Sequence, residues 1–510
     1  MPMDILLLVL LILLAGAGAI VASARRWPGW AHWIAWGAVA ASLLVWLLAR
    51  AQLPLLMATP GVETDAVWGG VAWRWQVDQL AWQMSLWLLL FLFLVVSVWP
   101  DADERAPSTL GLTLAMGVAG LLPLWAENAG TLLASWTLLG LIWAVGLWLG
   151  SERAERVGTR LWWRLSGLGA ALFCLGMGAA TGAAGWLLLA AAVQLGAFPL
   201  HGWRPTGAAL HTPWSGLLLL LPAYGGAALL ARIGVDTAAV LAYSLPLTGV
   251  GLLSLLAGVL AAWRALDDPS RLAAALVMSQ AGVILLASSW GGGAVVLAEA
   301  RVLLLAFGLL LVVHRATPTP VARLVAAVAV AALGAGPLLA GFAGRTALYD
   351  AWIRDGRPVL LFVTALLHVL LVAGALAGVW RGAPAAGLSF TLPATNRPAF
   401  IVRQVGLLLP AVALVTFAGL AQAGWLSWVL VLLPLAAGIF LSRYTGSTLE
   451  TAQIVRQSLR VRFPWHSLNA GARAVLTGIG AALREAAGIL ESEGGILWLL
   501  LFLVIFWLAR

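Results

Sequence analysis

The sequence contains no lysine and a single cysteine, and charged residues make up only 10% of its 510 positions. All 29 basic residues are therefore arginines, and no lysine ammonium is available to take up and release a proton. One cysteine, Cys174, excludes an internal disulfide framework, CxxC redox chemistry and thiolate-held clusters. We expect this thiol to pack as a small apolar group, and the sequence predicts neither a cofactor nor a metal site.

Apolar residues dominate what is present. They account for 62% of the chain, and the mean hydropathy is +0.99. Apolar runs of about 20 residues, each long enough to cross a bilayer, recur from end to end. The opening run, MPMDILLLVLLILL, follows no basic segment, so we expect a first span there rather than a cleaved signal peptide. The pattern predicts an all-α polytopic membrane protein in the lipid bilayer, with about 16 transmembrane helices, at 3–24, 30–49, 77–99, 107–126, 128–150, 161–180, 183–203, 213–231, 237–263, 272–289, 294–313, 324–347, 358–380, 403–421, 424–442 and 494–509.

The net charge of +9 follows from arginines in the short loops between these spans. Arg25 and Arg26 follow the first span, which predicts a cytoplasmic loop there. If the spans alternate across the membrane from that loop, most other loop arginines also fall on the inner side. We therefore expect a bacterial inner membrane protein with its N-terminus outside, and no nucleic-acid partner.

The middle of the chain divides into two units of five spans, 107–231 and 237–380. Because five is odd, the second unit must start on the opposite side of the membrane, and tandem units of this kind are inverted repeats. The other expected parts are a three-helix segment at 1–100 with a short hairpin at 51–76, two extra helices at 403–442, an amphipathic surface helix at 448–493 (a lateral helix), and a last span at 494–510.

Each five-span unit contains a helix interrupted by proline or glycine. In the first unit the stretch QLGAFPLHGWRPTGAALHTPWS (194–215) carries Pro199, Pro205 and Pro213 at membrane depth. In the second, GAGPLLAGFAGRTALYDAW (334–352) predicts a break at Gly341 and Gly344. A bilayer tolerates broken helices where the freed backbone groups face protein or a wet cavity. Glycine and proline are also frequent in ordinary membrane helices, but the matching positions favour an ion or substrate path.

Ionisable side chains within the membrane are costly, about 2.5–3.5 kcal/mol on insertion scales, and they mark functional sites. In the second unit these are Glu299 and Arg301 in the eleventh span, His314 at its end, Arg345 near the break and His368 in the thirteenth span. Glu299 and Arg301 point about 200° apart on a helix, so each needs another partner. Arg345 is one candidate partner for Glu299.

The first unit offers two histidines, His201 and His211, which flank its break. An unperturbed imidazole titrates near neutral pH, so both are candidates for an ion path. An alternative role for His201 is to donate to backbone carbonyls that the kink sets free.

Several motifs in a common order resemble the antiporter-like membrane subunits of respiratory complex I, of Mrp cation/proton antiporters and of energy-conserving hydrogenases. The segments that carry the resemblance are VDQL (77–80), WTLLG (136–140), FPLHGWRP (198–205), TPWS (212–215), DDPSRLAAALVMSQAG (267–282), with its retained Gln280, and GFAGR (341–345). The predicted lateral helix and last span are similar to the C-terminal extension of the largest such subunit.

The resemblance implies a proton path along the membrane midplane, through a glutamate, a lysine in each broken helix, and lysine or histidine between them. In this sequence the glutamate position is Thr137, the first lysine position is Gln194, and the second is Arg345. The eighth span has no ionisable group in 216–231. Threonine and glutamine can pass a proton along a hydrogen-bonded chain without holding charge, and arginine stays protonated at any physiological pH.

Three functions stay open on the sequence. The first is a proton- or cation-translocating subunit of a complex I-like assembly, atypical because its first-half relay is replaced. The second is a non-pumping structural or coupling subunit of such an assembly. The third is a secondary transporter of a small anion attracted to Arg345. The chain itself carries no nucleotide or haem motif, so any NADH:quinone oxidoreductase-type activity belongs to partners, in a complex I-like, hydrogenase-like, Mrp-like or inorganic-carbon uptake assembly.

Overall fold

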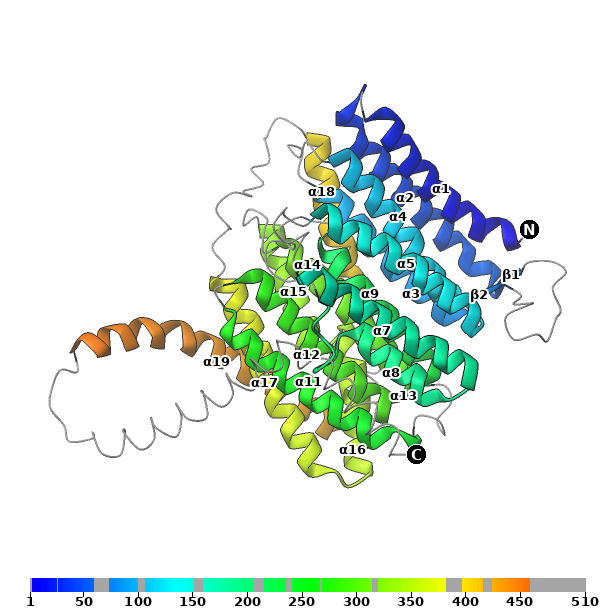
Figure 1. Ribbon diagram of the computed structural model, residues 1–510. Helices are drawn as coiled ribbons and strands as arrows, with labels where there is room; N and C mark the ends of the chain where they lie inside the picture. The colour runs from blue at the N-terminus through cyan, green and yellow to red at the C-terminus, as the bar shows by residue number, and fades with distance from the viewer. Residues whose placement is uncertain are drawn as a thin grey trace.

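The computed structural model describes residues 2–24, 26–58, 73–99, 106–150, 159–204, 215–234, 241–266, 268–313, 320–381, 397–415 and 424–458. These residues form a bundle of helices (Figure 1). Eleven helices of the described chain are long and apolar enough to cross a membrane, and four shorter apolar helices accompany them. The chain is therefore an integral membrane protein.

The N-terminal segment contains three long helices, α1 (Pro2–Ser23), α2 (Ala31–Ala49) and α3 (Gln79–Ser97), with short 3₁₀ turns at Pro28–Trp30 and Arg50–Gln52. Between α2 and α3 the strands β1 (Leu55–Ala58) and β2 (Arg74–Val77) pair antiparallel, which confirms the expected hairpin. Asp78 begins α3 as an N-cap, because its carboxylate accepts from the backbone N–H of Ala81 at 2.7 Å.

The remaining helices lie in the regions of the predicted spans, but two helices divide the span predicted at 324–347, and the one predicted at 183–203 ends as a helix at Leu195. The first unit comprises α4 (Ala106–Trp125), α5 (Ala129–Gly150), α7 (Thr159–Thr181), α8 (Ala184–Leu195) and α9 (Ser215–Ile233). The second comprises α11 (Ser244–Arg264), α12 (Pro269–Trp290), α13 (Gly292–Arg301), a π-helical turn η4 (Val302–Ala306), α14 (Phe307–Val313), α15 (Pro320–Leu333), α16 (Ala340–Arg354) and α17 (Pro358–Arg381). Two helices close the described chain, α18 (Arg397–Ala413) and α19 (Trp425–Ser458).

The predicted last span and residues 459–493 of the predicted surface helix lie outside the described residues. Residues 448–458 continue α19 without interruption, so no separate helix begins at 448, and in Figure 1 the end of α19 extends away from the bundle. The count of sixteen crossings and the inverted relation of the two units stay predictions.

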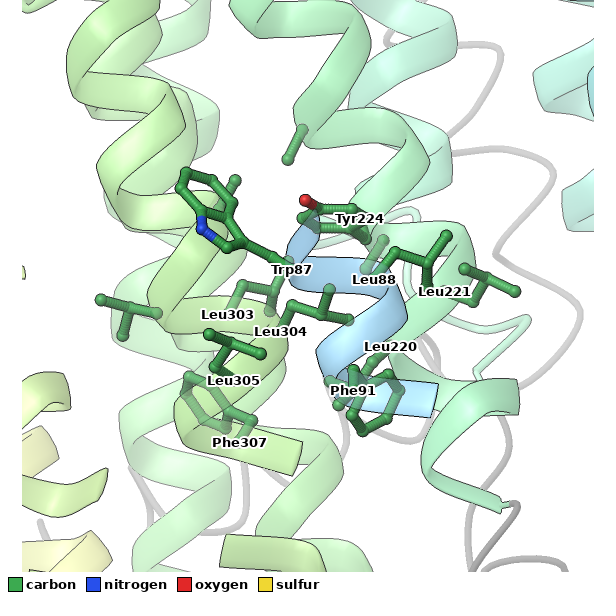
Figure 2. Packing of buried hydrophobic residues seen from close by; sticks show 14 of the residues in the cluster. Trp87, Leu88, Phe91, Leu220, Leu221, Tyr224, Leu303, Leu304, Leu305 and Phe307 are labelled. Atoms are coloured by element: carbon green, nitrogen blue, oxygen red, sulfur yellow. The ribbon is translucent and has the colours of Figure 1, made fainter. Parts of the chain in front are cut away.

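The innermost helices are α12, α9 and α3, whose membrane segments are 94%, 89% and 83% buried, against 28% for α1. Figure 2 shows one part of this core, where Trp87 and Phe91 of α3 lie beside Tyr224 of α9 and beside Phe307, next to the π-helical turn. A π-helical turn adds one residue to a helix and is frequent at functional sites. Here it follows directly after Glu299 and Arg301.

Tryptophan side chains tie the helices together by indole hydrogen bonds. Trp46 and Trp82 each donate to the other's backbone carbonyl, at 3.0 and 2.9 Å, and Trp143 donates to the carbonyl of Leu218 at 2.8 Å. A buried indole needs an acceptor, and between membrane helices such bonds add to packing. These tryptophans therefore have a structural role. Cys174 is buried, as expected for a small apolar side chain.

Candidate functional site

Both predicted helix breaks are present, and the two helices end in the same way. After α8, the N–H groups of Gly196 and Ala197 donate to the carbonyls of Val193 and Ala192 at 2.9 and 3.1 Å. After α15, Ala335 and Gly336 donate to Ala332 and Ala331 at 3.1 and 2.6 Å. This is the Schellman pattern, which places one residue in the left-handed region.

The residue with positive φ differs between the two breaks. It is Gly196 in the first, with φ of +62°, and Ala335 in the second, with φ of +53°. Leu338 adds a second non-glycine at +65°. Non-glycine residues in this region cost about 1–3 kcal/mol each and cluster at functional sites.

The expectation that Gly341 and Gly344 form the second break is wrong in position. Both lie inside α16, and the break falls before them, at 334–339. Their lack of a side chain serves close packing instead. A Cβ on Gly344 would lie 2.9 Å from Oε1 of Glu299, and one on Gly341 would lie 2.5 Å from the carbonyl of Ala332.

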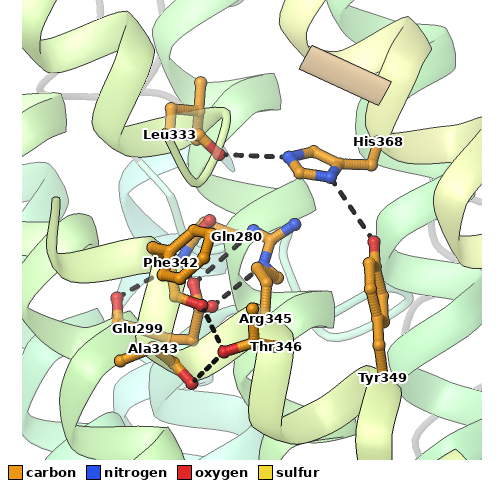
Figure 3. Close-up of polar contacts among 9 residues, drawn as sticks. All are labelled: Gln280, Glu299, Leu333, Phe342, Ala343, Arg345, Thr346, Tyr349 and His368. Carbon is orange, nitrogen blue, oxygen red and sulfur yellow. Dashed lines mark hydrogen bonds and ion pairs between the residues drawn. The ribbon is translucent and has the colours of Figure 1, made fainter. Parts of the chain in front are cut away.

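Glu299 and Arg345 form a buried ion pair, so the candidate pairing named from the sequence is present. Arg345 Nε lies 2.8 Å from Glu299 Oε1, and Nη2 lies 3.5 Å from Oε2. The side chains are 0% and 1% exposed. Gln280 on α12 donates from Nε2 to Glu299 Oε2 at 2.7 Å (Figure 3). The carboxylate is therefore held by three helices, α12, α13 and α16, and a buried charge of this kind is tolerated because it is paired and hydrogen-bonded.

A second polar pair lies on the other side of Arg345 in Figure 3. His368 on α17 has Nε2 3.3 Å from the carbonyl of Leu333, at the end of α15, and Nδ1 3.5 Å from the hydroxyl of Tyr349. The tautomer that satisfies both contacts carries its proton on Nε2 and accepts from Tyr349 at Nδ1. The carbonyl at the end of α15 is therefore contacted by a neutral imidazole in this tautomer.

These five residues, Gln280, Glu299, Arg345, Tyr349 and His368, are here called the second-break cluster. It combines a carboxylate, a permanent cation and a histidine among buried side chains. Within the described residues, no three His, Cys, Asp or Glu side chains converge to hold a metal ion. The cluster is suited to holding and passing protons, or to attracting a small cation to Glu299.

The first break is built around an arginine that sequence reasoning placed in a loop. Arg204 is 5% exposed. Its guanidinium donates to the carbonyl of Leu195, the last residue of α8, and from Nη1 to the carbonyl of Ala274 on α12 at 3.2 Å. The N–H of Phe198 donates to Ser254 Oγ on α11 at 2.9 Å. The segment after α8 is therefore fixed to both α11 and α12.

The remaining candidates of the first unit do not gather at one point. Gln194 is buried at the end of α8. His201 is half-buried and stacks on Phe198, with ring centroids 5.5 Å apart. Thr137 is exposed on α5, and its hydroxyl donates to the carbonyl of Leu133 at 2.7 Å, so it does not face the interior of this chain. Pro199 lies in the turn after α8, whereas His211, His314, Pro205 and Pro213 lie outside the described residues.

Arg301 does not join the second-break cluster. Its Nη2 donates to the carbonyls of Ala413 and Val415, at the end of α18, and its guanidinium lies 5.5 Å from the ring of Trp87. The same end of α18 accepts the N–H of Ala340 through Leu414 at 2.8 Å. Arg301 therefore anchors α18 beside the start of α16.

Arginines on helix C-termini are a recurring device in this chain. Besides Arg204 and Arg301, Arg232 donates to the carbonyls of Leu124 and Ala126 at the end of α4, and Arg403 donates to Trp99 just beyond α3 at 3.3 Å. A helix C-terminus carries about half a negative charge, and a guanidinium has five donors in a planar fork. This use favours arginine over lysine.

Sequence reasoning missed Arg204 and Tyr349. The Trp-Arg-Pro context of Arg204 is typical of a loop, so its burial gave no signal. Tyr349 lies one turn after Arg345, a spacing at which two helical side chains meet. This spacing would have identified Tyr349 as a neighbour of Arg345 from the sequence.

No protein-family model matches the chain, and no curated protein sequence matches it. Solved structures do. A chain of the Mrp complex from Dietzia sp. DQ12-45-1b is 18% identical, with a TM-score of 0.69 over 98% of this chain. A chain of the membrane-bound sulfane sulfur reductase, an archaeal respiratory membrane complex, is 17% identical, with a TM-score of 0.63 over the whole of both chains. A chain of respiratory complex I from Thermus thermophilus is 19% identical, with a TM-score of 0.62 over 86% of this chain and 99% of that one.

This chain spans 62% of the length of the Mrp chain. At these identities the likeness is one of fold. It extends over nearly the whole chain and agrees with the motif order in the sequence. The chain therefore shares its fold with chains of the Mrp, sulfane sulfur reductase and complex I assemblies, which confirms the predicted resemblance to that group of proteins.

Proposed function

We propose that this chain is a proton- or cation-translocating, antiporter-like subunit of a complex I-like membrane assembly, and that the second-break cluster is its ion-handling site. The supporting observation is the buried ion pair of Glu299 with Arg345, next to a histidine that contacts the freed carbonyl of a broken helix. Buried ionisable groups in a membrane protein are expensive, so they mark ion paths.

The roles within the cluster follow from chemistry. Arg345 stays protonated, so it is the fixed positive charge that pairs with Glu299. A proton or cation that reaches Glu299 competes with this guanidinium. His368 and Tyr349 then offer the next acceptor and donor, towards α17 and α15. Gln280 holds the carboxylate in place from α12.

A second candidate function is a non-pumping structural or coupling subunit of the same kind of assembly. The first unit favours it. The buried Gln194 cannot hold charge, Thr137 faces outwards, and the guanidinium of Arg204 is committed to backbone carbonyls. The third possibility, an anion transporter, loses support because Arg345 is already neutralised by Glu299.

The partners in this proposal are other membrane and peripheral subunits that supply the driving reaction, in an assembly of complex I, hydrogenase, Mrp or inorganic-carbon uptake type. Matches to chains of three multi-subunit complexes support such partners. The arginine-rich inner loops support a bacterial inner membrane location with the N-terminus outside.

The test is coupled ion movement by the purified assembly in proteoliposomes, with proton and Na⁺ uptake measured separately while the partner reaction is driven. We expect E299Q to abolish uptake with the assembly intact. The matched control is E127Q, which changes an exposed carboxylate just beyond α4 and should leave uptake unchanged. Full uptake by an intact E299Q assembly would favour the non-pumping role, with ions moved by another subunit.

A further inference from the structure

The first helix break exposes backbone carbonyls at membrane depth. Helix α8 has 12 residues, so it is about 18 Å long, well short of the roughly 30 Å hydrocarbon core. Its C-terminal end therefore lies within the membrane. Helix C-termini carry partial negative charge, and in transporters the C-terminal ends of half-helices and unwound carbonyls are where Na⁺ or protons are held.

Here that position is taken by the chain's own cation. The Arg204 guanidinium donates to Leu195 at the end of α8 and to Ala274 on α12. It forms no ion pair with a carboxylate anywhere in the described ranges. A buried cation without a carboxylate is stable only where dipoles surround it, so the carbonyls are its counter-charge.

The local backbone is shaped to admit the guanidinium. Gly196 turns the chain with φ of +62°, and a Cβ at this residue would collide with Nε of Arg204. Gln194, which is 2% exposed, has no acceptor for its Nε2–H₂ group among the described residues, and neither has the Nε–H of Arg204. The unpaired groups at this break are therefore N–H donors, which cannot coordinate an incoming cation.

The second break differs in one chemical respect. Its freed carbonyl, that of Leu333, is contacted by His368. The imidazole is neutral in the tautomer that satisfies both of its contacts, whereas a guanidinium carries a permanent positive charge. The two breaks thus share a backbone pattern and differ in whether the group on their carbonyl carries a fixed charge.

We propose that Arg204 is a built-in cation that fills the carbonyl site at the first helix break and closes it to mobile protons and metal cations. A fixed arginine and the dipoles of half-helices are known physical means of excluding protons and cations from a membrane pathway. This sealing function needs no driving partner, and it holds whether or not the second-break cluster pumps.

The test is passive cation uptake by the full chain in proteoliposomes, under an imposed membrane potential and without any partner, with separate proton-sensitive and Na⁺-sensitive dyes. Removing a unit charge about 5 Å from an incoming cation in a weakly screened interior favours entry by about 100-fold. We therefore expect R204Q to raise uptake at least about tenfold, and R204K, which keeps the charge, to stay near the wild-type rate.

The matched control is R232Q. Arg232 also donates to helix-end carbonyls, those of Leu124 and Ala126, but lies half-buried at the end of α9. R232Q therefore tests whether removing any arginine from helix-end carbonyls increases passive cation uptake. Folded R204Q with wild-type uptake would overturn the proposal, and so would equal leaks in R204Q, R204K and R232Q.

A second measurement covers a variant that folds poorly. Guanidinium ion at millimolar concentration is added to R204A, and Tm is followed in detergent. A vacated cation site should bind guanidinium and raise Tm in a saturable way, with no such rise in the wild type or in R232A. The absence of a rise specific to R204A would count against a cation site there.

Discussion

Neutralising one member of the Glu299–Arg345 pair should destabilise the protein much more than neutralising both. E299Q leaves the Arg345 guanidinium buried beside an amide, and R345Q leaves the carboxylate with Gln280 as its remaining side-chain donor. Breaking a buried pair by removing one partner typically costs about 3–5 kcal/mol, because an uncompensated charge stays in the interior. We expect each single variant to lose stability in this range.

The structure supports a value near the lower end. One contact is short, Nε to Oε1 at 2.8 Å, and the other is long, Nη2 to Oε2 at 3.5 Å. A pair about 4 Å apart attracts by about 4 kcal/mol at an effective dielectric constant of 20. In E299Q/R345Q no charge remains, and neutral replacements of buried pairs are often nearly neutral in stability. The double variant should therefore lie within about 1 kcal/mol of the wild type.

The assay is a double-mutant cycle on the free energy of unfolding of the full chain in mixed micelles. Two single losses of about 3 kcal/mol each, set against a loss of at most about 1 kcal/mol in the double variant, give an expected interaction energy of about 5 kcal/mol. The matched control is the exposed pair Asp268–Arg271, whose N···O distance is 3.1 Å and whose side chains are 42% and 72% exposed. Its cycle should give no more than about 1 kcal/mol. Additive effects of E299Q and R345Q would refute the buried pair.

Three further substitutions test the surroundings of the two breaks. G344A places a methyl group 2.9 Å from the Glu299 carboxylate, so we expect a loss of about 1–3 kcal/mol in unfolding free energy and slower ion uptake. G196A forces a side chain into a backbone with φ of +62°, which should cost about 1–2 kcal/mol from the backbone alone and is read from Tm. Y349F removes the hydroxyl that meets His368. It should cost about 1 kcal/mol and slow ion uptake, and an unchanged uptake rate would exclude the Tyr349–His368 contact from the path.

The sequence predicted an all-α membrane fold well, because a membrane span is recognised from its length and its hydropathy. It also offered Arg345 as one candidate partner for Glu299, since each charge in the membrane needs a partner and few were available, and the structure shows that pair. The exact place of the second break was harder to find. Ala335 and Leu338 adopt positive φ there, and neither residue type signals a left-handed backbone as glycine does.

Two other misses have a different physical cause. Lipid and protein interior are both apolar, so the exposed face of a membrane helix has no polar pattern to identify it. The outward position of Thr137 on α5 was therefore invisible. The burial of Arg204 was hidden for a related reason, because the carbonyls that hold it belong to the backbone and leave no mark in the sequence.

The most direct test of the account is ion uptake by the intact assembly carrying E299Q/R345Q. This variant keeps the packing of α13 against α16 while removing both charges, so lost uptake cannot be explained by a stranded charge. If the second-break cluster carries the ion, the number of ions taken up per turnover of the partner reaction should fall. It should reach the number that the other subunits of the assembly move on their own. Wild-type uptake by a stable E299Q/R345Q assembly would contradict the account.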